Sequence, residues 1–485
     1  MAAASPNPCV EGAAASDVAL DGAAAGGRVL FLPTAMRGHM TPLLRLAAHF
    51  VQLQRFEVHI WLGGRFLEMA PEGAIIHQDF GMDGVDQWTT ELEQVFGDLS
   101  SSAPDWLSSL AGMICSLKKD DVARTFVDMQ IGAASMVKKV SPTLVIADGF
   151  YQTGGRIPGL CHRHSAAKFV AIQCPGRPEP WGRLSVWVKL IRKQGDKLKG
   201  LPEIAKAMDE RLEAETGPPL PKAEHTWLRI LPGCRALVAE RPEPQEVFVG
   251  PFISVLAAPG SDLQDLEAWV NDGAEKEPIV YVSFGTLVRP SPALLQRLAA
   301  ALAAGPWRVL WSLPQSQREP LPANLQAITP KWRLEAFVPQ AAVLQHPSVR
   351  CFVSHCGQNS VHEALAAGVP MVCLPFYCDQ YEWAASVCKY RKAGVMLDKV
   401  KSTEAQITAA VQRALTDESL RARALSCRDD IVRWGEGASD LLTGGMRPGD
   451  CVGVPLAAAV ITGAVERRAV ESLQGLGTKC GCTVQ

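Results

Sequence analysis

The sequence has 485 residues, 47% of them hydrophobic and 20% charged, with a formal net charge of −2 at pH 7. This length suffices for two or more domains with large cores, and the composition is that of an ordinary globular protein. The balanced charge gives no global attraction to nucleic acid or to anionic membranes, so we expect neither as a partner. The longest apolar run, 452–465, contains Pro455 and is shorter than the roughly 18 residues of a membrane helix.

The 14 cysteines follow no framework spacing, and several fall in apolar segments, where a reduced thiol behaves as a small hydrophobic side chain. This usage favours a reducing compartment, and the N-terminus lacks the apolar core of a signal peptide, so we expect a cytoplasmic protein. A zinc site could be suspected at Cys351, His355, Cys356, Cys373 and Cys378. The spacing of these residues matches no known zinc-binding pattern, so we expect no metal site.

The chain begins with a segment, 1–27, that is rich in Ala and Gly and without periodicity, which predicts disorder. Residues 29–33 predict the first strand and residues 40–53 a helix, so His39 should lie in the loop between them. An imidazole there suits a general base, because its pKa lies near neutrality. A histidine that only caps the helix or contacts solvent is the alternative that the spacing leaves open.

Further strands are predicted at 56–62, 74–77, 143–147 and 168–172, and helices within 88–139 and at 152–164. Asp148 directly follows the strand at 143–147, on the rim where His39 is expected. Its carboxylate can orient an imidazole and stabilise its protonated form, or cap the turn that follows, or do both. The stretch 174–199 begins as a loop rich in Pro and Gly that contains Trp181, and continues as a basic amphipathic segment that contains Trp187.

Composition predicts three boundaries in the remaining chain. We expect a first domain at 28–250, a linker rich in Pro, Gly and small residues at 251–265, and a second domain at 266–436. The segment 437–485 is dominated by Gly, Pro and Ala, and we expect a weakly structured tail there. Within the second domain, apolar runs predict strands and periodic runs predict helices. The strands are expected at 279–284, 307–311, 350–354 and 370–374, and the helices at 292–304, 358–367, 381–392, 403 onward and 418–434.

The stretch 332–380 carries the strongest functional pattern. A helix that opens at Gln358 offers unpaired N–H groups and the positive end of its dipole, which attract phosphate. Gly357 lets the backbone approach closely, and His355, Asn359 and Ser360 can add donors. Glu363, one turn deeper on the same face, can accept hydrogen bonds from ribose hydroxyls. For any one of these residues, a plain structural role is the alternative.

Asp379 and Gln380 follow the strand at 370–374 and could hold another polyhydroxylated group. Ligands of open parallel sheets bind beyond the carboxyl ends of the strands, where these groups should converge. The whole run F-V-P-Q, H-P, H-C-G-x-N-S-x-x-E-A-L-A-A-G-V-P, D-Q resembles the C-terminal signature of the UDP-glycosyltransferases, inverting enzymes with the GT-B fold. The resemblance implies an α/β protein with two Rossmann-like domains that face each other across a cleft.

The resemblance also implies residue roles. The G-H-x-x-P pattern at 38–42 resembles the family motif in which His39 is the catalytic base, and Asp148 resembles the residue that orients it. S-F-G-T at 283–286 resembles a phosphate-side loop, although a turn into a helix capped by Thr286 is an equal alternative. The implied donor-site residues are Ser283 and Thr286 at the diphosphate, Phe337 stacked on uracil, Val338 and Gln340 near the nucleoside, His355, Gly357, Asn359 and Ser360 at the phosphates, Glu363 at the ribose, and Gln358, Asp379 and Gln380 beside the sugar.

Two positions depart from the plant members of this family, which usually have Trp where this chain has Phe337 and Gln358. Phe337 can still stack, whereas Gln358 removes a large ring beside the sugar. Gln380 is the residue usual in glucose users, which favours UDP-glucose. We therefore expect transfer of a hexose, with inversion, to a hydroxyl of a small lipophilic acceptor, with the UDP-sugar as co-substrate and no further cofactor. A UDP-sugar epimerase or hydrolase, or a non-catalytic nucleotide-sugar binding protein, are the alternatives.

Overall fold

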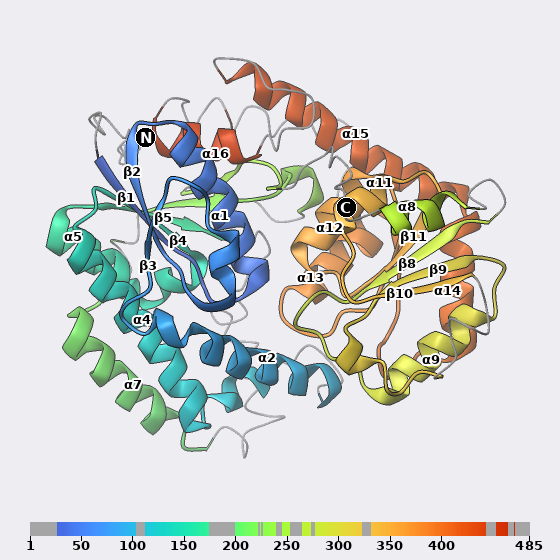
Figure 1. Ribbon diagram of the computed structural model, residues 1–485, viewed down its shortest axis with the longest axis horizontal. Helices are drawn as coiled ribbons and strands as arrows, with labels where there is room; N and C mark the ends of the chain where they lie inside the picture. Colours follow the sequence, from blue (N-terminus) through green and yellow to red (C-terminus); the bar gives the residue numbers. More distant parts are fainter. Residues whose placement is uncertain are drawn as a thin grey trace, which may run out of the picture.

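The computed structural model describes residues 27–102, 112–173, 199–221, 224, 227–238, 245–252, 264–272, 277–322, 331–442, 453–463 and 470. Several expectations lie outside these residues: the disordered segment up to residue 26, the basic stretch with Trp181 and Trp187, most of the linker, and the end of the tail. The described part forms two parallel sheets with helices packed on them (Figure 1).

The first sheet has seven parallel strands in the order β3-β2-β1-β4-β5-β6-β7. Its central strands are nearly unbroken apolar runs buried on both faces, as parallel sheets covered by helices require. The strand order reverses between β1 and β4, where Leu32 pairs with Ala147. The strands are β1 (Gly27–Leu32), β2 (Phe56–Trp61), β3 (Ile75–His77), β4 (Leu144–Asp148), β5 (Lys168–Ile172), β6 (Leu228–Leu231) and β7 (Glu246–Phe248).

Helices connect these strands and cover the first sheet. Helix α1 and helix α4 pack against its central strands, and α7 packs outside α4. The helices are α1 (Arg37–Gln52), α2 (Val85–Ser102), α4 (Asp120–Val140), α5 (Arg156–Ser165) and α7 (Leu201–Thr216), with short 3₁₀ turns η1 (Gly64–Met69), η2 (Met82–Gly84), η3 (Gly149–Gly155) and η6 (Arg235–Leu237).

The second sheet has six parallel strands in the order β10-β9-β8-β11-β12-β13, and its order reverses between β8 and β11. Its strands are β8 (Ile279–Ser283), β9 (Arg308–Ser312), β10 (Trp332–Glu335), β11 (Val349–Ser354), β12 (Met371–Cys373) and β13 (Gly394–Met396). Its helical segments are α8 (Gln264–Asn271), α9 (Pro292–Ala303), η8 (Gln315–Gln317), α11 (Gln340–Gln345), α12 (Gln358–Ala366), α13 (Gln380–Ala385), the π-helical turn η9 (Ser386–Tyr390), α14 (Glu404–Thr416) and α15 (Glu418–Asp440).

Two of the contacts between the domains come from helices. Helix α15 leaves the second sheet and runs back toward the first (Figure 1), where the Trp434 ring packs on Gly250. On another side, the end of α2 enters the interior of the second sheet: Val95 and Leu99 join its apolar cluster, and the rings of Phe96 and Tyr377 lie 5.0 Å apart. The two sheets are therefore braced at separate places rather than joined by one linker.

The structure corrects three expectations. Helix α1 begins at Arg37, so His39 lies in its first turn and not in a preceding loop. The region after Gln380 is α13 followed by a π-helical turn, not one helix to 392. The tail is not weakly structured throughout, because α15 extends to Asp440 and α16 (Gly453–Ile461) is a buried helix packed on α1.

Candidate active site

His39 and Asp148 meet where the first sheet reverses its strand order. His39 lies two residues after the start of α1, which follows β1, and Asp148 is the last residue of β4, the neighbouring strand. The Nδ1 atom of His39 is 2.9 Å from Oδ2 of Asp148. The other oxygen, Oδ1, accepts a hydrogen bond of 2.9 Å from the Phe150 N–H. Asp148 therefore caps the following turn and holds His39 at the same time.

The exposure of the two side chains differs in the way a base and its orienting group require. The Asp148 side chain is 6% exposed, whereas that of His39 is 46% exposed. Withdrawal from solvent lowers the pKa of His39, but the charge and hydrogen bond of Asp148, with a contribution from the charge of Asp379, raise the pKa to about 8. Burial raises the pKa of Asp148, and the charge and hydrogen bond of His39 reverse this, leaving its pKa below its usual value.

The influence of Asp379 on His39 places the two domains face to face at this point, because Asp379 belongs to the second sheet. It follows β12 and is the residue before α13. Gln380 beside it is buried, and its Oε1 accepts hydrogen bonds from the Phe376 and Tyr377 N–H groups. Gln380 thereby fixes the loop that carries Asp379.

His355 lies at the corresponding reversal point of the second sheet, between the ends of β8 and β11. Burial lowers the pKa of His355 to about 4, so the imidazole is neutral at physiological pH. Its ring is enclosed by two glycines: a Cβ on Gly285 would lie 2.9 Å from its Cε1, and one on Gly357 would lie 2.5 Å from its Nε2. Gly285 also has a φ of +71°, which favours glycine.

The loop after β8 is a turn and not the start of a helix. Ser283 is buried and its Oγ accepts a hydrogen bond of 3.4 Å from the Gly285 N–H, while Thr286 is exposed in the turn. The next helix, α9, begins six residues after Thr286 and is capped by Ser291. The alternative that Thr286 caps a helix is therefore wrong, and Thr286 is exposed to solvent.

Helix α12 begins at Gln358, with Gly357 as its N-cap residue and no side chain capping it. Uncapped N–H groups at a helix start bind anions. Asn359 is half-buried in this first turn, and Ser360 is buried. The Gln358 side chain does not extend beside the candidate sugar position: its Nε2 donates to the carbonyl oxygen of Pro232 in the first domain.

Hydrogen bonds made by Gln340 orient the side chains at the candidate ribose position. Its Nε2 donates to Glu363 Oε2 at 2.7 Å and to Ser360 Oγ at 3.0 Å, and its Oε1 accepts from the Tyr281 hydroxyl at 3.3 Å. Burial raises the pKa of Glu363, against the effects of the Gln340 hydrogen bond and the charge of Arg45. The carboxylate is thus oriented by one donor and has further acceptor capacity.

Phe337 is 67% exposed, the largest exposed fraction among the large apolar side chains of the described residues. Val338 beside it is buried and anchors the segment. An exposed ring beside an anchored residue is suited to stacking on a flat ligand. The guanidinium of Arg37, from the first turn of α1, lies 5.6 Å from the ring centroid.

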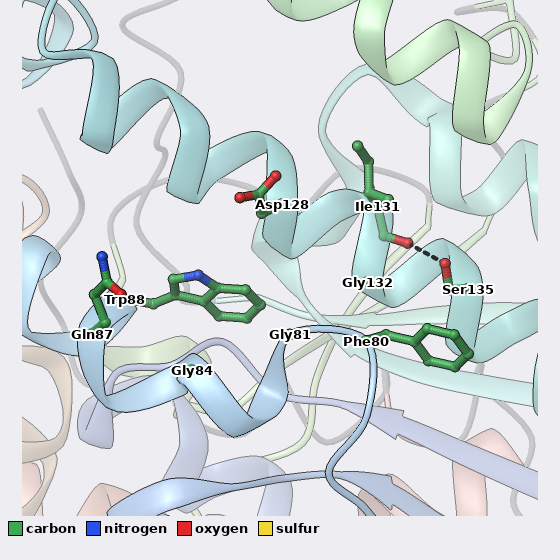
Figure 2. Close-up of a pocket in the computed structure, with 9 residues that line it drawn as sticks. All are labelled: Phe80, Gly81, Gly84, Gln87, Trp88, Asp128, Ile131, Gly132 and Ser135. Atoms are coloured by element: carbon green, nitrogen blue, oxygen red, sulfur yellow. Dashed lines mark hydrogen bonds between the residues drawn. The ribbon is translucent and has the colours of Figure 1, made fainter.

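A hollow of about 360 Å³ lies elsewhere in the first domain, between the segment leading into α2 and the middle of α4. Figure 2 shows the Trp88 indole along its floor, with Asp128, Ile131 and Ser135 above it on α4. The hollow is lined by none of the residues named for the candidate active site.

The sequence is similar to known proteins over part of its length. Residues 222–427 match the family described as UDP-glucoronosyl and UDP-glucosyl transferase. Over this stretch, which is less than half of its length, the chain is similar to the UDP-glycosyltransferase family. Flavonol 3-O-glucosyltransferase F3GT2 of Actinidia chinensis var. chinensis is 34% identical over 197 residues, 40% of this chain and 42% of the relative. The 2-hydroxyacylsphingosine 1-beta-galactosyltransferase of Rattus norvegicus is 31% identical over 244 residues, 49% of this chain and 42% of the relative.

These alignments span less than half the length of the curated relatives that the chain matches. Solved structures align over more of it. A glycotransferase of kitacinnamycin has a TM-score of 0.63 at 19% identity and covers 84% of this chain and 95% of its own. The UDP complex of a UDP-glucose: anthocyanidin 3-O-glucosyltransferase has a TM-score of 0.57 at 20% identity, covering 92% and 99%. The fold is GT-B, as the sequence predicts.

Two further findings concern absences. Within the described ranges, no helix is both long and apolar enough to cross a bilayer. In that same part of the chain, no group of three or more His, Cys, Asp or Glu side chains is arranged to hold a metal ion.

Sequence reasoning missed three residues of the site. Arg37 and Arg45 face the second domain from α1, and Tyr281 supports Gln340 from within β8. Arg37 and Arg45 are eight residues apart, which is about two helical turns, so they lie on one side of the helix. This spacing was the sequence feature that could have identified them. Tyr281 is fully buried in an apolar strand, and nothing in its sequence context distinguishes it from a core residue.

Proposed function

We propose that the protein transfers a hexose, with glucose the first choice, from a UDP-sugar to a hydroxyl group of a small lipophilic acceptor, with inversion at the anomeric carbon. The observation that carries this proposal is the position of His39. It is hydrogen-bonded to Asp148, half exposed, and close enough to the second domain for the charge of Asp379 to act on it. A base on one side of a cleft and an anion-binding helix start on the other are what a direct transfer needs.

The second domain binds the donor in this proposal. The first turn of α12 and the neutral His355 receive the diphosphate, and the helix dipole stabilises the charge that develops on the UDP leaving group. Glu363, oriented by Gln340, accepts hydrogen bonds from the ribose hydroxyls, and Phe337 stacks on the uracil. Asp379 binds sugar hydroxyls from the loop that Gln380 fixes. Each assignment uses a group whose position and partners are described above.

The first domain activates the acceptor. Nε2 of neutral His39 removes the proton of the acceptor hydroxyl as its oxygen attacks the anomeric carbon and the bond to the UDP oxygen breaks. Asp148 keeps the Nδ1 proton in place and stabilises the imidazolium that forms. Attack in line with the departing diphosphate inverts the configuration, and UDP leaves with the electron pair of the broken bond.

The names of the matched relatives support the choice of substrates. Several plant relatives are named as glucosyltransferases or galactosyltransferases of anthocyanidins or flavonols, and the rat relative is named for a sphingosine acceptor. All of these acceptors are apolar bodies with hydroxyl groups. The plant names support a phenol as the first acceptor class to test and UDP-glucose or UDP-galactose as the first donors.

The test is a screen of UDP-sugars against phenol, sterol and sphingoid acceptors, with product masses read by mass spectrometry. We expect the gain of one hexose with UDP-glucose and a phenolic acceptor, and loss of at least about a hundredfold in rate in His39→Ala, the usual contribution of a general base. The variant should still bind UDP. Hydrolysis or epimerisation without transfer to any acceptor would favour the alternative enzymes, and UDP binding without turnover would favour a binding protein.

A further inference from the structure

Helix α1 presents a polar ridge to the second domain. Arg37, Thr41 and Arg45 are four residues apart and so share one face of the helix, opposite the buried stripe that includes Leu43 and Leu46. The Thr41 hydroxyl donates to the Arg37 carbonyl oxygen at 2.8 Å. The ridge therefore carries two guanidinium groups, both on the helix that holds His39 in its first turn.

The two arginines of this ridge lie near the residues proposed to bind the two parts of the nucleoside. The Arg37 guanidinium lies over the Phe337 ring, 5.6 Å from its centroid. Arg45 donates to the Phe252 carbonyl oxygen, and its charge stabilises the ionised form of Glu363. One rigid helix thus spans the residue proposed for the base and the residue proposed for the ribose.

The charges around this position favour a role for the ridge. On the second domain, His355 is neutral, whereas Glu363 and Asp379 are acidic, so these groups do not repel the guanidinium groups of the ridge. Arg289 is near the turn of Thr286, but it donates to the Thr286 carbonyl oxygen and lies 3.8 Å from Glu93. Arg37 is the exposed guanidinium that lies on the aromatic ring itself.

We propose that Arg37 is a donor-positioning residue supplied by the acceptor-side domain: its guanidinium covers the Phe337 stack and closes the nucleoside position from across the cleft. This inference rests on the proposed function, because it takes Phe337 as the residue that stacks on uracil. A guanidinium plane adds attraction to an aromatic stack through the ring quadrupole. Because Arg37 and His39 occupy the same helical turn, a bound donor would also fix the position of the base.

The experiment compares Arg37→Leu, Arg37→Lys and, as the matched control, Arg55→Leu. Arg55 is exposed on the same domain, directly after α1, and removing it changes the charge equally. Binding of UDP and of UMP is measured by calorimetry, and KM and kcat are measured for UDP-sugar and acceptor. In Arg37→Leu we expect both nucleotides to bind about three- to thirtyfold more weakly, the range that cation–π contacts supply.

Further measurements distinguish a role of Arg37 in positioning the donor from a general loss of structure in the variant. The KM for the donor should rise by the same factor while the KM for the acceptor and the pH dependence of kcat stay as in the wild type, and Arg37→Lys should recover part of the loss. Unchanged or tighter nucleotide binding in Arg37→Leu would overturn the proposal. A loss confined to UDP would also overturn it, because it would assign Arg37 to the diphosphate. If the wild type itself bound no UDP, the proposed function would fail first.

Discussion

The Gln358 side chain donates a hydrogen bond to the carbonyl oxygen of Pro232, and this bond joins the first turn of α12 to the loop that follows β6 in the other domain. The contact lies at the mouth of the candidate diphosphate site. It accounts for the direction of the Gln358 side chain, which bridges the two domains at this position.

This contact gives a first prediction. In Gln358→Ala the junction loses one hydrogen bond, worth about 1 kcal/mol, so the donor side should be held less firmly. We expect the KM for the UDP-sugar to rise about two- to tenfold and the pH dependence to stay unchanged. Steady-state kinetics measure both quantities. Gln412→Ala, at an exposed position of α14, is the control, and equal KM values in the two variants would contradict the assignment.

The pH dependence of turnover follows from the His39–Asp148 pair. The active form of the base is the neutral imidazole, and a pKa of about 8 leaves about a tenth of His39 neutral at pH 7. The value of kcat/KM should therefore rise with pH and level off above about 8. A profile already flat from pH 6 upward would show that His39 is not the titrating base.

In Asp148→Asn we expect the pKa of His39 to fall instead of rise. The amide keeps an oxygen for the Phe150 N–H but removes the charge that raises the His39 pKa, so withdrawal from solvent dominates and the pKa falls. The limb of the kcat/KM profile should move to lower pH, while the plateau falls by about a hundredfold or more because the imidazolium loses its partner. Circular dichroism checks that the variant is folded. A profile that kept its limb at the wild-type pH would contradict the pairing.

Glu363 can be tested through the group it is proposed to bind. Hydrogen bonds to a charged acceptor contribute about 1.5–3 kcal/mol, so Glu363→Gln should weaken UDP binding about ten- to a hundredfold. The same change should erase the preference for UDP over 2′-deoxy-UDP, since that preference depends on a ribose hydroxyl. Calorimetric titration with both nucleotides measures this. If the variant still discriminated between the two nucleotides as the wild type does, Glu363 would not be the ribose ligand.

Gly285 should be intolerant of a side chain. Its φ of +71° and the proximity of the His355 ring mean that Gly285→Ala combines backbone strain with a displaced imidazole, at a cost of about 1–3 kcal/mol. We expect a lower Tm and weaker UDP binding. Gly84→Ala is the matched control, because a Cβ there meets no atom within 4 Å. Equal behaviour of the two variants would mean that the ring is not held by the glycine.

Much of the second domain could be predicted because its signals are local. The helix opening at Gln358 was expected to reach 367 and ends at Ala366, and the capping box of Thr403 with Gln406 is present at the start of α14. Apolar runs between glycine and proline turns marked β11 and β12 to within a residue or two. In such segments the spacing of the apolar residues and the residues at the ends of the segment predict the same helix or strand.

The parts that escaped prediction depend on distant partners. Strands β6 and β7 have four and three residues and carry Arg229 and Glu246, so their pattern is too short and too polar to identify. Pro42 and Gly38 argue for a later start of α1. Pro42 is the sixth residue of the helix, and the hydrogen bond between Asp148 and His39 holds the preceding turn in place. The direction of Gln358 is set by Pro232, 126 residues away, which no local pattern reveals.

The packing of α16 on α1 has a consequence for synthesis. The helix that carries His39 is translated before the second domain, and α16, which covers part of its surface, is translated after it. Domains usually fold in the order in which they emerge, but here the first domain acquires its final covering only after the second has been translated. A chain cut short before residue 453 would present this apolar contact surface to solvent, so premature termination should yield aggregating protein rather than a shorter working enzyme.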